Sequence, residues 1–517
     1  MANHTGYRGI SSASGVSSHE APEQVDPQGL QAIRDNELAP ASINTIELHG
    51  AKCTRRSLLD HIFNPLVENN STSTLGDVVA RVHAAQLKLS QLGIFKEESI
   101  ETFVSDAPKS AGRSDVTELD IAFNVKEKSR LSLGAGTDIG NTEGSAYTNA
   151  ELRNIFGGAE TLTINARTGT RTRSAYNAAL SGPVPSNPYV RMTFEAQQSS
   201  TSKPWASHEE NITGGSVRAA WQPASILQPN TGDSHSITLS SVWRQVTGLL
   251  AGASPTVRGD AGDSLKNSIT YSFTRDRLDR SSGPVPTLPQ RGYLIRAVSE
   301  LAGWGALQGD VSFSKTELEL SSIRPLDLPG TKSTSGITIG SGFRMGVLYP
   351  LPSGFNFSGL AKLSRINDRF QLGGPTDVRG FKLGGLGPHD NGDAVGGDVY
   401  AAGGVNMMLP LPRLGASSPL RFQLFANGGR LVALKNKGKS KEGKGHPSQM
   451  DSKAISTSMV SALGELTDGV PSVAVGAGLV YAHPAARFEL NFSLPLALRR
   501  GEEGRKGLQV GVGINFL

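Results

Sequence analysis

The chain has 517 residues, of which 37% are hydrophobic, and it carries a mean hydropathy of −0.24 and a formal net charge of +5. No apolar run approaches the ~18 residues that a transmembrane helix needs, which excludes helical membrane proteins. A transmembrane β-barrel is compatible with these values, because the polar lumen side of each strand lowers the apparent hydrophobicity. The single cysteine, Cys53, cannot form an internal disulfide.

Residues 1–40 contain Ser, Glu and Gln, with neither an apolar stretch nor the Arg-rich, acid-poor character of a transit peptide. They are predicted to form a disordered tail. The pattern then becomes mixed over residues 41–128. A short strand at about 43–48 precedes a helix over 54–67, and a second helix begins at Thr74 and ends at Gly93. Two further strands complete a β-α-α-β-β order, which predicts a small α+β domain.

From about residue 129 to 517 apolar side chains recur at every second position, which is typical of strands. A clear example is Phe488, Leu490 and Phe492, which alternate with Arg487, Glu489 and Asn491. At roughly 24 residues per strand and connection this span holds sixteen strands, a number common in membrane barrels. A soluble array of this length would be expected to show a regular repeat, and none is found. The barrel is therefore preferred to a soluble β-rich binding protein.

The residues from 435 to 453 form a lysine-rich segment between strands. The lysines are Lys435, Lys437, Lys439, Lys441, Lys444 and Lys453. A charge run of this kind predicts a solvated, disordered loop, placed at about 433–468. Binding of an acidic partner is the alternative.

The sequence GGPTDVRGF, which begins at Gly373 and ends at Phe381, is the most distinctive stretch of the chain. Two glycines and a proline cannot continue a strand or helix, so they predict a loop of fixed shape. Arg379 lies between Val378 and Gly380 and presents five donors in a rigid fork. That fork suits a buried polar lock better than a solvated tip. A long surface turn is the alternative.

Asp368-Arg369-Phe370-Gln371-Leu372 followed by this stretch resembles the sixth-loop signature of the BamA-type superfamily of β-barrel insertases, in particular its members in the mitochondrial sorting and assembly machinery, the SAM complex. The resemblance covers about residues 43–517. It implies a membrane all-β fold, a sixteen-stranded transmembrane β-barrel over 129–517 preceded by one small POTRA domain over 41–128. It also implies that a loop of about 368–395 folds into the lumen.

The implied lock residues are Gly373, Gly374, Val378, Arg379, Gly380 and Phe381. The implied partner of Arg379 is Asn427, where bacterial relatives tend to have Asp. A neutral hydrogen bond is therefore expected there instead of a salt bridge.

A second match lies at the C-terminus, where Gln509-x-Gly511-x-x-Ile514-x-Phe516 resembles the β-signal of mitochondrial outer-membrane barrels. A lateral seam is predicted between the first strand, about 130–139, and the last, about 508–516. Glycines in both strands would weaken the closing pair, or would only relieve crowding in the lumen. The predicted seam residues are Leu131, Leu133, Gly134, Gly136, Gln509, Gly511, Gly513, Ile514 and Phe516.

Motifs for phosphate binding, zinc proteases and CxxC metal sites do not occur in the sequence, so no enzyme activity, metal or cofactor is predicted. His389-Asp390 is interpreted as a surface pair, and nothing indicates nucleic-acid binding. The resemblance implies folding and insertion of β-barrel precursors into the mitochondrial outer membrane by strand addition at the seam. It implies precursors, membrane lipid and accessory SAM subunits on the cytosolic side as partners, with the POTRA domain in the intermembrane space. The alternative is a protein-translocating or passive channel of the same superfamily.

Overall fold

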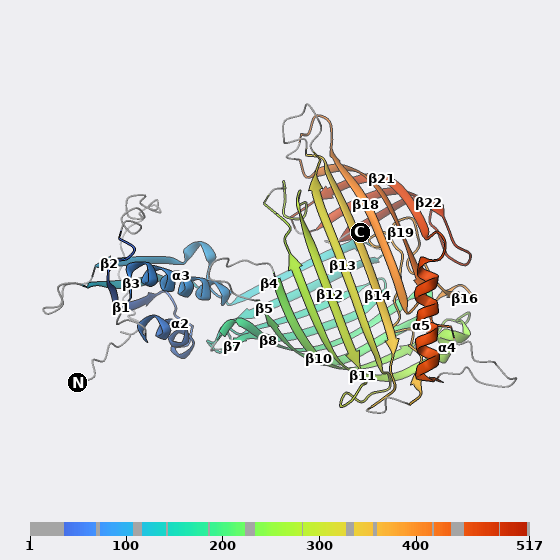
Figure 1. Ribbon diagram of the computed structural model, residues 1–517, viewed down its shortest axis with the longest axis horizontal. Coiled ribbons are helices and arrows are strands. Elements are labelled where there is room, and N and C mark those ends of the chain that lie inside the picture. The colour runs from blue at the N-terminus through green and yellow to red at the C-terminus, as the bar shows by residue number, and fades with distance from the viewer. Residues whose placement is uncertain are drawn as a thin grey trace.

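The computed structural model comprises a small N-terminal α+β domain and a large, curved sheet that forms a barrel (Figure 1). The described residues are 36–68, 73–106, 116–140, 143–184, 187–222, 233–281, 283–326, 336–354, 359–415, 418–435, 449–484 and 486–513. Most of the predicted tail therefore lies outside the described residues, and so do Ile514 and Phe516 of the predicted seam.

The N-terminal domain contains three strands and two α-helices in the order β-α-α-β-β. Its elements are β1 (Ala41–His49), α2 (Arg56–Glu68), α3 (Leu75–Gln91), a short 3-10 helix (Glu97–Ser99), β2 (Glu101–Asp106) and β3 (Thr117–Asn124). The sheet order is β1-β3-β2, with β1 parallel and β2 antiparallel to β3. Apolar side chains of both helices pack with those of β3 in one core, including Leu59, Phe63, Leu89 and Phe123.

A reciprocal capping box begins helix α3. The Thr74 hydroxyl accepts a hydrogen bond from the Asp77 backbone N–H at 3.2 Å, and Asp77 Oδ2 accepts one from the Thr74 N–H at 3.3 Å. The backbone and hydroxyl bonds from Thr74 favour the charged carboxylate, so they lower the pKa of Asp77 below its usual value. The Thr-x-x-Asp spacing in the sequence thus marks the helix start correctly.

The barrel is one sheet of 16 strands in which consecutive strands pair antiparallel, as the alternating pattern predicts. Eleven strands precede the Gly-rich segment and five follow it. The barrel strands are β4 (Leu131–Gly140), β5 (Glu143–Arg153), β6 (Thr161–Gly169), β7 (Thr172–Val184), β8 (Asn187–Lys203), β9 (His208–Trp221), β10 (Asp233–Thr247), β11 (Gly262–Asp276), β12 (Gly292–Ala302), β13 (Phe313–Pro325), β14 (Thr338–Pro350), β18 (Val399–Pro410), β19 (Leu420–Val432), β21 (Ser472–Ala482), β22 (Arg487–Ala497) and β23 (Gly507–Gly513). The predicted sixteen-stranded fold is confirmed.

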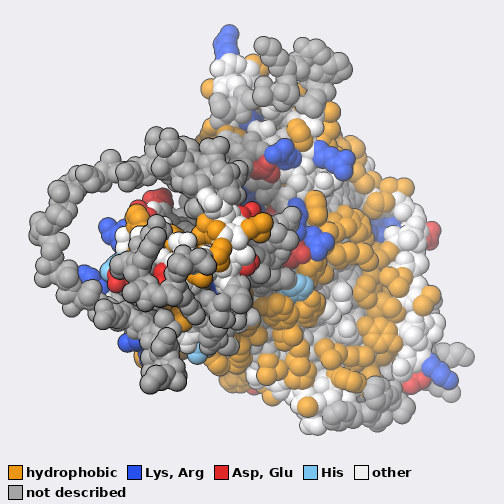
Figure 2. Space-filling model, turned by 60° about the vertical axis from the view of Figure 1, so that its left-hand side comes forward, with side chains coloured by type: hydrophobic (Ala, Val, Ile, Leu, Met, Phe, Trp, Pro, Cys, Tyr) orange, Lys and Arg blue, Asp and Glu red, His pale blue; other side chains and the backbone are white. Residues whose placement is uncertain are grey.

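The alternation along each strand separates an apolar outer face from a polar lumen. On β22, Phe488 and Phe492 are 43% and 49% exposed, whereas Glu489 between them is 2% exposed. Figure 2 shows hydrophobic side chains gathered over the outer wall of the barrel, beside the N-terminal domain. Within the described ranges, the helices are all too short or too polar to cross a membrane.

The lysine-rich segment differs from its prediction, because helix α5 (Ser452–Thr467) forms within the range expected to be disordered. Ile455, Met459 and Ala462 are buried on one face of this helix, an apolar stripe that the lysine count obscured. Met459 and Ala462 pack with Val399 and Val432, which face outward. The helix therefore lies on the outside of the barrel wall. The prediction was wrong for residues 449–467, and residues 436–448 lie outside the described part of the chain.

The turn between β5 and β6 of the barrel is hydrogen-bonded to the N-terminal domain. The Arg55 backbone N–H donates to the Gly157 carbonyl at 2.7 Å, and the Asn154 amide donates to the Thr54 hydroxyl at 3.2 Å. Gly157 has a φ of +86°, and an added Cβ would lie 2.7 Å from the Arg55 Cγ and 3.0 Å from the Cys53 carbonyl oxygen. Glycine is therefore required for this close approach of the turn to the N-terminal domain.

We expect Gly157→Val to separate the two domains, because a β-branched side chain would clash with Arg55 and strain the left-handed backbone by about 1–2 kcal/mol. Limited trypsin digestion of the folded protein should then cut the interdomain residues around Lys126 and Lys128 faster than in the unmodified chain. Gly144→Val is the matched control, since an added Cβ at Gly144 meets nothing within 4 Å. Cleavage of both variants at the unmodified rate would show that the turn does not hold the domains together.

Candidate functional site

The chain between β14 and β18 folds into the lumen of the barrel. Its apolar side chains Phe370, Leu372, Val378, Phe381 and Leu386 are buried in one cluster with lumen-facing residues of the wall. Those wall residues are Ala302, Phe313, Leu348, Tyr400, Ala402, Leu431 and Ala474. The segment that the sequence singles out as an in-folded loop, about 368–395, thus lies against the inner face of the late strands.

Three glycines of the segment adopt conformations that other residues rarely adopt. Gly373, Gly374 and Gly380 have φ angles of +109°, +138° and +89°. The Gly373 N–H donates to Asp377 Oδ2 at 2.6 Å, which closes the turn. A Cβ at Gly380 would lie 2.5 Å from the Cβ of Ala474 on β21, so the segment touches the wall there. These glycines therefore fix the direction in which Arg379 points.

Arg379 is 1% exposed and forms an ion pair with Glu489 on β22. Its Nε lies 3.0 Å from Glu489 Oε2 and its Nη2 lies 3.4 Å from Oε1. The guanidinium carbon is 5.1 Å from the centre of the Phe425 ring on β19, a cation–π distance. The predicted lock residue is thus buried in an ionic contact.

Asn427 also contacts Arg379, but through the main chain. With its amide oriented so that both atoms have partners, the nitrogen donates to the Arg379 carbonyl at 3.1 Å and the oxygen accepts from the Arg379 N–H at 2.7 Å. Asn427 is therefore a neutral hydrogen-bond partner of the Arg379 main chain, whereas the Arg379 side chain pairs ionically with Glu489. Strand alternation places Glu489 on the lumen face, but it does not reveal which lumen residue lies level with the loop.

The carboxylate of Glu489 is shared between two guanidinium groups. Arg487 Nη2 lies 2.5 Å from Glu489 Oε1, and the Asn491 amide donates to Oε2 at 2.7 Å. Arg487 and Glu489 are two residues apart on β22, so they share the lumen face. Arg487 Nη2 also donates to Gln423 Oε1 at 3.0 Å. One buried anion therefore stabilises two buried cations, and one of these cations belongs to the in-folded segment.

Gln509, predicted as a seam residue, connects the last strand to the same segment. Its Oε1 accepts from the Gly380 N–H at 2.9 Å and its Nε2 donates to the Phe381 carbonyl at 3.2 Å. The Ser493 hydroxyl on β22 also donates to Gln509 Oε1, at 3.1 Å. The turn before β23 adds a main-chain bond, from the Arg505 N–H to the Gly380 carbonyl at 2.7 Å. The segment is thus attached to β22 and to the last strand, β23.

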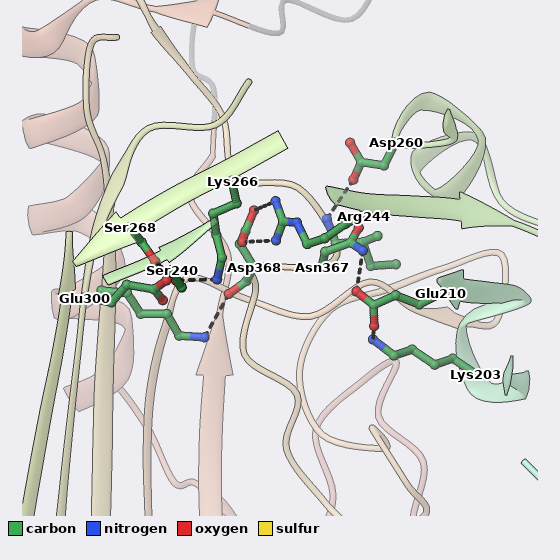
Figure 3. Close-up of polar contacts among 12 residues, drawn as sticks. Lys203, Glu210, Ser240, Arg244, Asp260, Lys266, Ser268, Glu300, Asn367 and Asp368 are labelled. Atoms are coloured by element: carbon green, nitrogen blue, oxygen red, sulfur yellow. Dashed lines mark hydrogen bonds and ion pairs between the residues drawn. The ribbon is translucent and has the colours of Figure 1, made fainter. Parts of the chain in front are cut away.

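A second ionic contact attaches the segment to the opposite wall (Figure 3). Asp368 pairs with Arg244 on β10, with its two oxygens 2.5 and 3.2 Å from the guanidinium nitrogens. Both side chains are buried. Lys315 on β13 donates to the Asp368 carbonyl at 3.0 Å, and the Asn367 amide donates to Glu210 on β9. The segment therefore spans the lumen between early and late strands.

The predicted seam residues within the described part of the chain lie on the two end strands of the sheet. Within the described residues, no hydrogen-bonded pairing joins β4 to β23. Leu131 and Leu133 are 54% and 72% exposed on the outer face of β4. Gly511 and Gly513 stand opposite Glu489 and Arg487 in the register of β22 and β23.

The glycines of β4 likewise lie on the lumen side. A Cβ at Gly134 would be 2.2 Å from Asn149 Oδ1, and one at Gly136 would be 2.6 Å from the Tyr147 hydroxyl. These contacts favour the interpretation that glycines relieve crowding in the lumen. His389-Asp390 is structural, since Asp390 accepts from the Thr256 hydroxyl at 2.7 Å. The described residues hold no group of His, Cys, Asp and Glu suited to a metal ion.

We expect Glu489→Gln to destabilise the barrel more than Arg379→Met. Without Glu489, two buried guanidinium groups lose their anion, whereas without Arg379 the Glu489–Arg487 pair remains. Removing one partner of a buried pair costs about 3–5 kcal/mol, so both changes should be large. The measurement is the free energy of unfolding in urea, followed by tryptophan fluorescence in detergent micelles.

Lys382→Met is the matched control on the same segment. Lys382 pairs with Glu503, but the two side chains are 57% and 43% exposed, and an exposed pair contributes only about 0–1 kcal/mol. Equal losses in all three variants would mean that the buried pair has no special role.

Three comparisons identify relatives of this chain. Residues 154–516 match the Omp85 superfamily domain. The SAM50-like protein of Schizosaccharomyces pombe is 34% identical over 487 residues, covering 94% of this chain and 93% of the relative. The sorting and assembly machinery component 50 homolog of Homo sapiens is 31% identical over 501 residues, covering 96% and 94%. BamA from Haemophilus ducreyi lacking POTRA domains 1–3 has a TM-score of 0.66 at 13% identity, over 92% of this chain and 84% of that chain. The chain therefore belongs to the SAM50 family of the Omp85 superfamily.

Proposed function

We propose that this protein folds β-barrel precursors and inserts them into the mitochondrial outer membrane as part of the SAM complex. The proposal is supported by relatives that are named as components of the sorting and assembly machinery and by the BamA-like barrel. The observation that carries it is the sheet with two end strands, β4 and β23, the second of which is hydrogen-bonded from inside to the in-folded segment.

Strand addition at β4 is the proposed mechanism. Lipid cannot satisfy backbone N–H and C=O groups, so a precursor strand that enters the membrane needs an edge with which to pair. The first strand offers such an edge next to β23. Pairing along it extends the sheet by main-chain hydrogen bonds. No nucleotide is required, because hydrogen-bond completion and the burial of lipid-facing side chains supply the free energy.

The asymmetry of the two ends favours β4 as the receiving edge. β23 pairs with β22 and is also bound to the in-folded segment through Gln509. β4 pairs with β5 and lies against β23. Separation of β4 from β23 would leave the bonds between Gln509 and the in-folded segment in place. We infer that the lock keeps β22 and β23 fixed while β4 accepts the precursor.

The proposed orientation follows from the position of the N-terminal domain. This domain, interpreted as a single POTRA domain, lies at the β5–β6 end of the barrel and is assigned to the intermembrane space. The in-folded segment enters the lumen from the other end of the barrel, and helix α5 lies on the outside of the wall near that end. This end is assigned to the cytosolic side. Accessory subunits of the SAM complex are expected to bind there. A passive channel is supported less well, because the segment occupies the lumen.

Disulfide crosslinking to an arrested precursor tests strand addition. In a Cys53→Ser background, Leu133→Cys on β4 should crosslink to single cysteines along the terminal strand of the precursor, in a fixed register. Leu239→Cys on β10 is the matched control, since Leu239 is also an exposed outer-face leucine but lies on a strand paired on both sides. We expect no register-dependent crosslinks from that position.

Two outcomes would count against the proposal. Crosslinks from a lumen position such as Asn165→Cys, with none from Leu133→Cys, would support a channel. Crosslinks of similar yield from Leu133→Cys and Leu239→Cys would indicate non-specific contact with the barrel wall.

A further inference from the structure

A row of small residues crosses the outer wall of the barrel far from the seam. Its members are directly paired from strand to strand, and all share the face that carries exposed Phe194 and Leu239. The row consists of Ala178 on β7, Ala196 on β8, Gly215 on β9, Ser241 on β10 and Asn267 on β11.

Larger side chains border this row on both sides. On one side, the next outward-facing position of each strand is occupied by a large apolar residue. These residues are also paired from strand to strand and are Leu180, Phe194, Val217, Leu239 and Ile269. On the other side the paired positions are Tyr176, Gln198, Thr213, Trp243 and Leu265, of which Tyr176, Trp243 and Leu265 are large and exposed. The row is thus the floor of a groove of about 830 Å³, which is lined by the floor residues and by four side chains of the first border, Leu180, Phe194, Val217 and Leu239.

The connection between β12 and β13 closes one end of the groove. Ala306 and Leu307 line the groove there. The connection is fixed to β11 by the Asn267 amide, which donates to the Gln308 carbonyl at 2.5 Å, and by the Asp310 N–H, which donates to the Leu265 carbonyl at 2.9 Å. The end of the groove is therefore built from ordered chain.

The dimensions of the groove fit one hydrocarbon chain. Five strands spaced about 4.8 Å apart give a floor roughly 19 Å long. Half of the ~30 Å hydrocarbon core of a bilayer, the depth occupied by one acyl chain, is about 15 Å. The bordering rows are four residues apart along the strands, so their Cα atoms are roughly 14 Å apart and their side chains narrow the space further. An α-helix with side chains, about 10–12 Å wide, is too broad for this floor.

The chemistry of the lining agrees with a hydrocarbon occupant. Glu195 is the one charged lining residue, and it belongs to the lumen face, where it accepts from the Asn177 amide. The outward side chains are aliphatic or aromatic except for Ser241 and Asn267 at the closed end. We propose that this groove binds one acyl chain of a membrane phospholipid, lying across strands β7 to β11. Unlike the lipids that surround the rest of the wall, this chain occupies a defined site.

The site has a structural consequence for the lumen. β10 carries Ser241 and Trp243 on the groove side and Arg244 on the lumen side, where it pairs with Asp368. A bound chain fills the depression behind this wall and stabilises the strand that holds the second anchor of the in-folded segment. The inference is independent of the proposed insertase role, because it concerns only the lipid-facing surface.

Photo-crosslinking to a defined lipid tests the site. The full-length protein is reconstituted in phosphatidylcholine nanodiscs that contain a phosphatidylcholine with a diazirine near the end of one acyl chain. After irradiation, adducts are mapped by peptide mass spectrometry. We expect adducts to concentrate on β7 to β10, and Ala196→Leu, which fills the floor, to reduce them several-fold.

Ala477→Leu is the matched control. Ala477 on β21 also faces outward, between Leu424 and Phe492, on the opposite part of the wall. This variant should leave the adducts on β7 to β10 unchanged. If Ala196→Leu fails to fold, judged by its heat-dependent gel mobility, Ser241→Leu replaces it.

Three results would overturn the proposal. One is an even distribution of adducts over β7 to β10 and β18 to β21, which indicates ordinary surrounding lipid. Another is undiminished labelling of the groove in Ala196→Leu. The third is a protein adduct from a photoreactive residue placed at position 196 in native membranes, which would assign the groove to a polypeptide.

Discussion

The buried carboxylate of Glu489, shared by Arg379 and Arg487, determines how the lumen of this barrel is organised. Charges removed from water are stabilised only when partners are close and well oriented. Here β22 provides the anion and one cation, and the in-folded segment provides the second cation. The segment can therefore occupy only the position in which Arg379 reaches Glu489. The glycines around Arg379 allow the backbone to approach the wall closely enough for this contact.

The segment acts as a strut because it is attached at two opposite walls. Asp368 pairs with Arg244 on β10, and Arg379 pairs with Glu489 on β22. Between these anchors its apolar side chains pack against lumen-facing residues of the late strands. A movement of β22 or β23 therefore breaks polar contacts that are fully buried.

The sequence predicts the architecture better than the site. Alternation over nearly 390 residues gives the strand count, because each strand buries one face only. The same rule assigns Glu489 and Arg487 to the lumen. It does not give the height of the loop relative to β22, which depends on the shear of the barrel and on the turn at Gly373. The family resemblance implies Asn427 as the partner of Arg379, and Asn427 binds the Arg379 main chain while the side chain reaches Glu489.

Helix α5 illustrates a different limit. Its apolar stripe is short, and the lysines that precede it dominate the composition of the segment, so a compositional rule predicts disorder. Val399 and Val432 pack against Met459, and Ala361 and Met450 pack against Ile455; these tertiary contacts explain why the helix is stable. Local pattern therefore predicts strands that repeat across the whole sheet, but it misses an element that depends on a single docking surface.

The glycines of the last strand lie beside the ion pairs of the lock. Gly511 and Gly513 stand opposite Glu489 and Arg487 in the register of β22 and β23. Glycine also lowers the stability of a strand, because it contributes no side-chain packing and loses more backbone entropy on folding. If the seam between β4 and β23 opens as proposed, these glycines lower the free-energy cost of opening, while Gln509 keeps β23 attached to the segment from inside.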